Sequence, residues 1–397
     1  MKIWLLFLLC CTYLNAEVQV DRFDFHLKAL KKQLAVIEKY KHAKDKEEIQ
    51  KLDDAIRAVR TPAFSLEVLL GFYQDHYSEL EGLKDLVKIL EDNTGKNIDR
   101  LEHIARLSKH AEGKKDKKYL SKTITYMKAR QDEGRSHIIK LLEDAKWLKS
   151  PLLKIEIEQD ELKHPGELAF DRIKRKLDKV EWDSKKDDRD FLAEEAIEYV
   201  EKHLIKGSLY DLTDLNGPMG LHKRRRMDRR LSILMSATNG LFVLTNEGTP
   251  NAYQELLSEP IAQGKFSKLP EASSGKRHIF FPRGIFLEMN KMIEEFGKAK
   301  DFGEAMHEWL PEMLLGSGEA PTVERANVMA DEIVSSWEGF EDPVKIAKRA
   351  YKRLLGLRPG TRRDEHTVYH ALTSALKEQI GMTKKEDCRR LAKAMAR

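Results

Sequence analysis

The chain has 397 residues, of which 41% are hydrophobic and 35% are charged, and its formal net charge is only +5. This length allows one large domain or two ordinary ones, and the apolar content is enough for a hydrophobic core. The small net charge excludes a chain that is polycationic throughout, so basicity matters only where lysines and arginines cluster.

The first 16 residues are predicted to be a secretory signal peptide. A short positive head precedes an apolar run from Ile3 to Leu14, and the small residue Ala16 ends the segment, as is typical of cleavable signals. The run is shorter than the about 20 residues that span a bilayer. Cleavage after Ala16 leaves Cys388 as the single cysteine, which excludes an intramolecular disulfide. We therefore expect an exported protein, periplasmic or secreted, with no membrane span in the mature chain.

Apolar residues recur every three or four positions along most of the remaining chain, which predicts helices. In the first half the expected helices are 18–40, 46–60, 65–92, 98–107, 119–148 and 191–205. Thr61-Pro62 is expected to end the second of these, and Asn93-Thr94-Gly95 to end the third. Between residues 152 and 186 the charge is dense and mixed, and this segment is expected to have the least regular structure.

In the second half a basic helix is expected at 220–244, followed by a long irregular insertion at 245–276 that is rich in Gly, Pro, Ser and Asn. Residues 278–281 suggest a short strand without an evident partner. Further helices are expected at 285–296, 302–314, 322–337, 343–355, 364–380 and 384–395. No β-rich block appears, so the predicted fold class is all-α.

The basic helix combines a cationic first half with an apolar second half. His222, Arg225, Arg226 and Arg229 are spaced to share one side of the helix. The core-facing stripe is expected to contain Leu231, Leu234, Met235, Leu241 and Phe242. Like charges four residues apart repel by a few tenths of a kcal/mol per pair, so an anion should compensate the cluster. That anion is either a carboxylate of the protein or a ligand.

A short pattern occurs in both halves of the chain. Gly95-Lys96-Asn97-Ile98-Asp99 resembles Gly297-Lys298-Ala299-Lys300-Asp301, and each is preceded by a helix with charge at its start and aliphatic residues after it. With the glycines aligned, Leu83, Val87 and Leu90 fall opposite Ile285, Met289 and Met292. The bland interpretation is coincidence between charged helices in a lysine-rich chain. The interpretation we favour is a helical unit present twice, with halves 17–207 and 208–397 packed about a pseudo-twofold axis and basic helices facing each other.

The pattern His222-x-x-Arg225-x-x-x-Arg229-Arg230-Leu231, followed by Gly297 and Asp301, resembles the CHAD domain (conserved histidine α-helical domain). The resemblance covers about residues 53–315. It implies two pseudo-symmetric helical halves and a basic central channel that binds inorganic polyphosphate or a similar polyanion without catalysis. Where the first half of that family also carries histidine and arginines, this chain has Arg57, Arg60, Phe64 and Ser65. Only one half of the expected channel therefore keeps its basic side chains.

Arginine presents a planar fork that binds phosphate oxygens in pairs, so closely spaced arginines suit a repeating polyanion. The candidate polyanion-binding residues are His222, Lys223, Arg225, Arg226, Arg229 and Arg230, with Arg57 and Arg60 from the first half. In the alternative interpretation these arginines are structural and pair with acids such as Glu194, Glu195, Glu198 and Glu201. The protein would then be a non-catalytic helical scaffold or partner-binding protein. Nucleic acid is not expected, because export and the lack of aromatic residues among the basic ones count against it.

Catalytic and metal-binding signatures are weak or missing. Glu161 and His164, like Glu304 and His307, have the i, i+3 spacing of di-iron bundles, and His366 and His370 lie i, i+4. No further inward carboxylates complete such a site, so neither a metal nor another cofactor is expected. Gly-rich phosphate loops, nucleophile elbows and zinc-protease motifs are missing as well. The sequence therefore predicts a protein that is not an enzyme.

Overall fold

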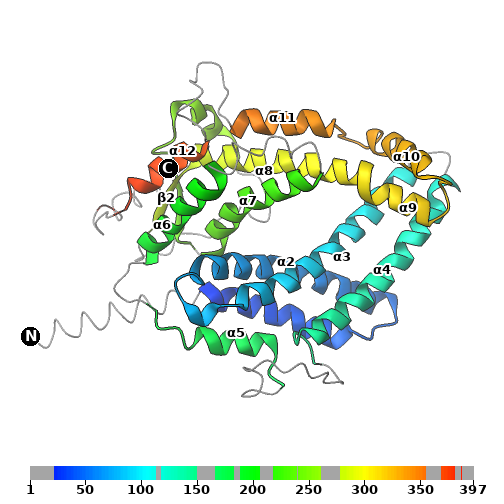
Figure 1. Ribbon diagram of the computed structural model, residues 1–397, viewed down its shortest axis with the longest axis horizontal. Coiled ribbons are helices and arrows are strands. Elements are labelled where there is room, and N and C mark those ends of the chain that lie inside the picture. Colours follow the sequence, from blue (N-terminus) through cyan, green and yellow to red (C-terminus); the bar gives the residue numbers. More distant parts are fainter. Residues whose placement is uncertain are drawn as a thin grey trace, which may run out of the picture. The chain divides into compact units, whose positions relative to one another are not determined.

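The computed structural model of the protein describes residues 22–112, 118–149, 166–182, 188–205, 218–238, 240–260, 278–354, 368–380 and 386. These residues are mostly helical (Figure 1), and the only sheet among them is a pair of short strands. The predicted all-α fold class is therefore confirmed. Within the described part of the chain, no helix has both the length and the apolar character needed to cross a membrane.

Contacts divide the chain into two compact units, Met1–Ser184 with Gly316–Glu319, and Lys185–Leu315 with Ala320–Arg397. The sequence prediction places the boundary after residue 207, whereas this division puts residues 185–207 in the second unit. The pseudo-twofold relation between two halves stays a prediction.

The first unit is a group of long helices. After a helix at 22–40 come α2 (Lys46–Tyr73), the 3₁₀ turn η1 (Ser78–Leu80), α3 (Leu83–Glu112), α4 (Lys118–Asp144) and α5 (Ala169–Leu177). Helix α3 packs against both α2 and α4. The buried side chains of α2 and α3 lie three and four residues apart, as amphipathic packing requires.

Two of the predicted helix ends in this unit are wrong. Helix α2 continues through Pro62, and α3 continues through Gly95. A proline inside a helix costs about 3 kcal/mol and a glycine about 1 kcal/mol. Each fully buried Leu or Phe contributes about 1.5–3 kcal/mol, so packing outweighs both local penalties. The chain breaks instead at residues 74–82, where η1 and Gly82, with a φ of +75°, form the turn.

The second unit is organised around α8 (Arg283–Glu304), which contacts both α7 (Pro218–Ala237) and α11 (Pro343–Leu354). These two helices lie on opposite sides of α8 (Figure 1). The remaining helices are α6 (Asp188–Tyr199), the π-helical segment η2 (Val200–Ile205), the 3₁₀ segment η4 (Asn251–Ser258), the π-helical segment η5 (Ala305–Trp309), α9 (Leu310–Gly316), α10 (Val323–Ser335) and α12 (Val368–Lys377).

The predicted gap between helices 285–296 and 302–314 is also wrong. Helix α8 runs through Gly297 and Asp301 and continues directly into η5 and α9. The first of these residues is buried within the helix, so its low helix propensity is again overridden by packing.

The basic helix is shorter than predicted, because α7 ends at Ala237 and residues 242–245 form strand β1 (Phe242–Thr245). Gly240, with a φ of +83°, lies in the turn between the two elements. Strand β1 pairs in parallel with β2 (Ile279–Pro282), in register Phe242 with Ile279, and this is the partner that the sequence did not reveal. Phe242 is therefore buried by the sheet and not by the helical stripe.

Several predictions fall outside the described residues. They are the signal peptide at 1–16, residues 152–165 and 183–186 of the mixed-charge segment 152–186, residues 261–276 of the insertion, and the helix at 384–395, with Cys388, apart from residue 386. Within the mixed-charge segment, residues 169–177 form the regular helix α5, so the expected irregular structure is wrong there. The first half of the insertion contains η4, a regular element that the prediction did not include.

Candidate functional site

The basic helix places four of the predicted arginines at half-buried positions on α7, namely Arg225, Arg226, Arg229 and Arg230. The helical backbone of His222 and Lys223 is described, but their side chains lie outside the described part of the structure. Arg57 and Arg60 lie on α2 in the other unit. The two groups of cations therefore belong to different units, and a channel lined by both groups stays a prediction.

Arg225 reaches from α7 across α8. Its guanidinium lies over Gly297, where an added Cβ would fall 3.0 Å from Nε and 3.1 Å from Cζ. A Cβ at this distance would be tighter than most real contacts, so glycine gives the guanidinium room that alanine would narrow. The sequence pattern that pairs an arginine helix with a downstream glycine is thus explained by a direct contact.

Arg225 is poorly neutralised by the protein. Among the described residues its one ion-pair partner is Asp301, with 3.9 Å between Nη1 and Oδ1, and its buried Nε has no hydrogen-bond partner. The Arg225 side chain is 29% exposed. A separation of 3.9 Å is too long for a hydrogen bond, so the described residues use few of the donors of this guanidinium.

Lys300 is the second cation at this point of α8. Its side chain is only 9% exposed, and its Nζ lies 3.4 Å from Oδ1 of Asp301 and 3.1 Å from Oε2 of Glu304. Burial raises the pKa of the Glu304 carboxyl, although Lys300 lowers it. We call Arg225, Gly297, Lys300, Asp301 and Glu304 the Arg225 corner.

Arg230 lies over an aromatic ring that the sequence analysis did not connect with it. Its guanidinium carbon is 5.6 Å from the centre of the Tyr199 ring, and the Tyr199 hydroxyl donates to the carbonyl of Met227 on α7. The His203 ring lies 5.0 Å from the Tyr199 ring. Tyr199 belongs to α6, so the aromatic residue comes from another helix and could not be found by scanning the basic segment.

Not every acidic residue of the predicted 191–205 helix pairs with an arginine of α7. Glu201 pairs with Lys377 of α12 at 2.6 Å. Asp228, the lone acid within the basic segment, is fully buried and accepts a hydrogen bond of 2.6 Å from the Tyr369 hydroxyl.

A similar corner occurs in the first unit. The Arg60 guanidinium lies over Gly95, where an added Cβ would be 3.5 Å from Cζ. Arg60 pairs with Asp99 at 3.4 Å and with Glu91 at 3.5 Å, and it lies over the Phe64 ring. We call Arg60, Gly95, Asp99 and Glu91 the Arg60 corner. The residues that the sequence pattern aligned thus share a local geometry, an arginine over a glycine with an aspartate one turn further along the helix.

The two corners differ in charge balance. Arg60 is held between two carboxylates, and Glu91 is only 5% exposed. Burial raises the pKa of the Glu91 carboxyl to about 7, although Arg60 lowers it. In the Arg225 corner one distant aspartate is shared with Lys300. Of the two arginines, Arg225 therefore lies farther from its nearest carboxylate.

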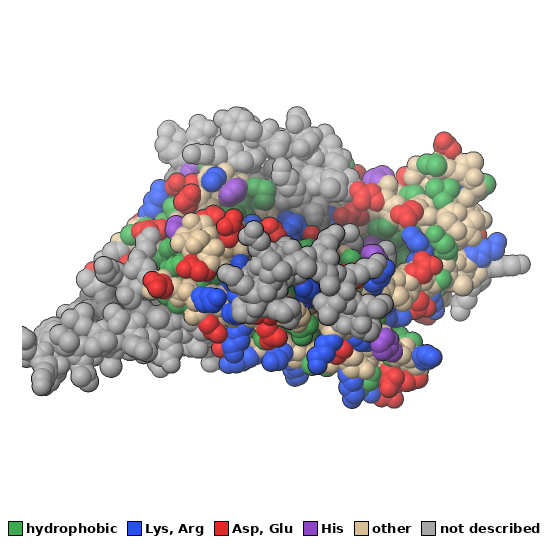
Figure 2. Space-filling view, turned by 60° about the horizontal axis from the view of Figure 1, so that its bottom comes forward, with side chains coloured by type: hydrophobic (Ala, Val, Ile, Leu, Met, Phe, Trp, Pro, Cys, Tyr) green, Lys and Arg blue, Asp and Glu red, His purple; other side chains and the backbone are tan. Residues whose placement is uncertain are grey.

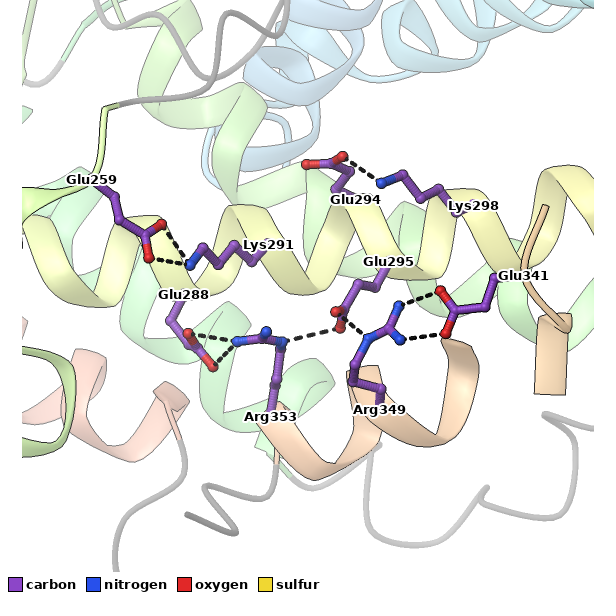
Figure 3. Close-up of polar contacts among 9 residues, drawn as sticks. All are labelled: Glu259, Glu288, Lys291, Glu294, Glu295, Lys298, Glu341, Arg349 and Arg353. Atoms are coloured by element: carbon purple, nitrogen blue, oxygen red, sulfur yellow. Dashed lines mark hydrogen bonds and ion pairs between the residues drawn. The ribbon is translucent and has the colours of Figure 1, made fainter. Parts of the chain in front are cut away.

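The other side of α8 shows how this fold neutralises arginines when they are structural. Arg349 bonds Glu295 at 2.7 Å and both oxygens of Glu341, and Arg353 bonds Glu288 and Glu295 at 3.1–3.2 Å (Figure 3). Acidic and basic side chains also intermingle over much of the face seen in Figure 2. Arg225 departs from this pattern of close pairing.

The described residues contain no group of three or more His, Cys, Asp or Glu side chains arranged to hold a metal ion. Glu304 of the Glu304-x-x-His307 pair is bonded to Lys300 instead. Glu161, His164 and His366 lie outside the described residues.

Comparison with family models, with curated proteins and with solved structures gives no match for this chain. The resemblance to CHAD domains gains no support from these comparisons and stays a prediction.

Proposed function

We propose that the protein is an exported, non-enzymatic helical protein that binds inorganic polyphosphate or another phosphate-rich polyanion on α7. The observation that carries this proposal is the state of Arg225. Its guanidinium is partly exposed, its nearest carboxylate lies at 3.9 Å, and its Nε lacks a hydrogen-bond partner among the described residues. A buried or half-buried donor without a partner costs free energy, which an anionic ligand with several oxygens would recover.

The neighbouring residues support the same ligand chemistry. Arg226, Arg229 and Arg230 follow on the same helix, so successive phosphate groups would meet successive cations. The Tyr199 ring holds Arg230 in place, which lowers the entropy lost when this arginine binds a ligand, and Gly297 leaves room for Arg225 beside α8. The CHAD-like pattern of the sequence agrees with this proposal but does not test it.

The test is binding of medium-chain polyphosphate to the purified protein over a series of salt concentrations. Because each phosphate contact releases counterions, replacing Arg225 with alanine should weaken binding and lower the slope of log K against log salt by about 1. An Arg225→Ala/Arg229→Ala variant should lose most of the affinity. Arg325→Ala is the matched control, because Arg325 is an exposed arginine of α10 without an ion-pair partner among the described residues.

Loss of binding in the Arg225 variants, with the control close to wild type, would support the proposal. A protein that is helical by circular dichroism and binds no polyphosphate at low salt would overturn it. Equal weakening in Arg225→Ala and Arg325→Ala would also overturn it, because binding would then follow net charge and not the site.

The second candidate is a helical scaffold or partner-binding protein with structural arginines. The contact of Arg230 with the Tyr199 ring and the close pairing of Arg349 and Arg353 favour it. In that case Arg225→Ala would leave polyphosphate binding unchanged and would lower the free energy of unfolding.

A further inference from the structure

One carboxylate oxygen lies between two cations in the Arg225 corner. Oδ1 of Asp301 is 3.9 Å from Nη1 of Arg225 and 3.4 Å from Nζ of Lys300. The Asp301 side chain is 37% exposed and Arg225 is 29% exposed, whereas Lys300 is 9% exposed. Asp301 and Arg225 are therefore the partly exposed members of this group, and Lys300 is its buried member.

Asp301 holds neither cation closely. A strong N–H···O bond to a carboxylate is about 2.7–2.9 Å long, and both contacts of Asp301 exceed this. By contrast, Arg349 and Arg353 of α11 make bonds of 2.7–3.2 Å to carboxylates of α8. Asp301 thus places a negative charge near Arg225 and Lys300, but its carboxylate lies too far from both cations to form strong hydrogen bonds with them.

The second carboxylate of the corner does not remedy this deficit. Glu304 pairs with Lys300 at 3.1 Å, and among the described residues the ion pair of Arg225 is with Asp301 alone, so Glu304 adds no carboxylate to Arg225. A phosphate group brings three or more oxygens to the same point. It can occupy the fork of Arg225, including Nε, and still reach Lys300.

We propose that Asp301 competes with the ligand for the anion site. The Asp301 carboxylate occupies the place between Arg225 and Lys300 where a phosphate group of the ligand binds. Lys300, which the sequence analysis did not assign, is then a binding residue for that phosphate. The inference depends on the proposed function for the identity of the ligand. What it predicts in addition is whether one substitution, Asp301→Asn, raises or lowers the affinity for that ligand.

The direction of this change in affinity distinguishes two roles of Asp301. If Asp301 competes with the ligand, its neutral isostere Asp301→Asn strengthens binding. If Asp301 only positions Arg225 for the ligand, the same change weakens binding. A structural role without any link to the site leaves binding unchanged.

The experiment compares medium-chain polyphosphate binding by Asp301→Asn with binding by Asp331→Asn. Both variants change the net charge equally, and Asp331 is an exposed residue of α10 without an ion-pair partner among the described residues. We expect Asp301→Asn to bind about fivefold more tightly than Asp331→Asn at physiological salt. Adding Lys300→Gln to Asp301→Asn should remove this gain, with circular dichroism confirming that the double variant is folded.

Equal or weaker binding by Asp301→Asn, relative to Asp331→Asn, overturns the inference. This outcome is distinct from failure of the proposed function. If wild type binds and Arg225→Ala does not, only the competitor role of Asp301 is lost. If no variant binds, the inference and the proposed function fail together, and binding by Asp301→Asn alone would support the inference even without measurable wild-type affinity.

Discussion

The guanidinium of Arg225 lies against Gly297 more closely than the guanidinium of Arg60 lies against Gly95. An added Cβ would fall 3.0 Å from the nearest Arg225 atom, but 3.5 Å from the nearest Arg60 atom. The first distance requires the arginine to move, whereas the second is an ordinary van der Waals contact. The two corners therefore offer a matched pair of glycine substitutions.

We expect Gly297→Ala to displace Arg225 and to weaken polyphosphate binding, although no charge is removed. Gly95→Ala should leave binding unchanged and should raise the free energy of unfolding by up to about 1 kcal/mol, the helix-propensity gain of alanine over glycine. Polyphosphate titration and urea denaturation of both variants measure the two effects. Equal effects of the two substitutions on binding would contradict the role of the close Arg225 contact.

Glu91 should make stability depend on pH. Its pKa is raised to about 7 in the folded protein, from the ordinary value of 4.5, so the folded state binds the extra proton between these values. Stability from this group is fully present below the unfolded pKa and is lost as the pH rises through the folded pKa. Glu91→Gln does not titrate, so its stability relative to wild type should rise with pH in this window. The total change should be a few kcal/mol, at about 1.4 kcal/mol per pKa unit.

Urea denaturation of wild type and Glu91→Gln between about pH 5 and pH 8 tests this window. The control is Glu102→Gln, which removes an exposed carboxyl of the same helix. A stability difference that stays constant with pH, or that falls as pH rises, would show that Glu91 is ionised throughout.

Arg353 and Arg349 should differ in their contribution to stability. Arg353 bonds both oxygens of Glu288, which is 1% exposed, whereas Arg349 bonds Glu341, whose side chain is 42% exposed. Arg353→Ala removes the arginine partner of a buried carboxylate and should cost about 3–5 kcal/mol. Arg349→Ala should cost about 1 kcal/mol, since water can replace the lost partner of Glu341. Urea denaturation midpoints should separate the two variants, and Glu288→Gln should recover part of the loss in Arg353→Ala. Similar costs for both arginines would contradict the greater contribution expected of the buried ion pair.

Tyr369→Phe should loosen the attachment of α12 to α7. The Tyr369 hydroxyl donates to the buried carboxylate of Asp228 at 2.6 Å, and loss of this donor should cost about 1–3 kcal/mol. Tyr40→Phe is the control, because the Tyr40 hydroxyl has no hydrogen-bond partner among the described residues. Thermal unfolding followed by circular dichroism measures both. A cost for Tyr369→Phe no larger than for Tyr40→Phe would mean that the hydrogen bond adds nothing to stability.

The periodicity of apolar residues predicted the fold class and much of the core. The aligned residues Leu83, Val87 and Leu90 and their counterparts Ile285, Met289 and Met292 are all buried. Helix ends were predicted less well, because Pro62, Gly95 and Gly297 are local breakers whose cost is exceeded by packing between helices. Strand β1, the partner of β2, was not predicted, because Leu241 and Phe242 continue the apolar spacing of α7 and were assigned to that helix.

The site was predicted in part. The arginines of α7 stand out by their density, but which of them lies over Gly297 of α8 follows only from the structure. Lys300 and Asp301 lay within the repeated pattern, but their chemistry depends on burial and on distances to Arg225, which no spacing rule provides. Tyr199 comes from α6, so its contact with Arg230 follows only from the packing of separate helices.

The π-helical segment η5 separates α8 from α9 within one unbroken run of helix. A π-helical turn holds more residues than an α-helical turn, so the side chains beyond it are rotated about the helix axis. The two parts of the run can therefore aim their faces in different directions. Before η5 the run carries the half-exposed Asp301, and after it Leu310 and Leu314 are fully buried. Deleting a single residue within η5 would restore the α-helical repeat and keep Leu310 and Leu314 on the same face, whereas deleting a residue from the α-helical turns on either side would rotate these leucines by about 100° about the helix axis. The run should therefore tolerate loss of a residue better within η5 than beside it.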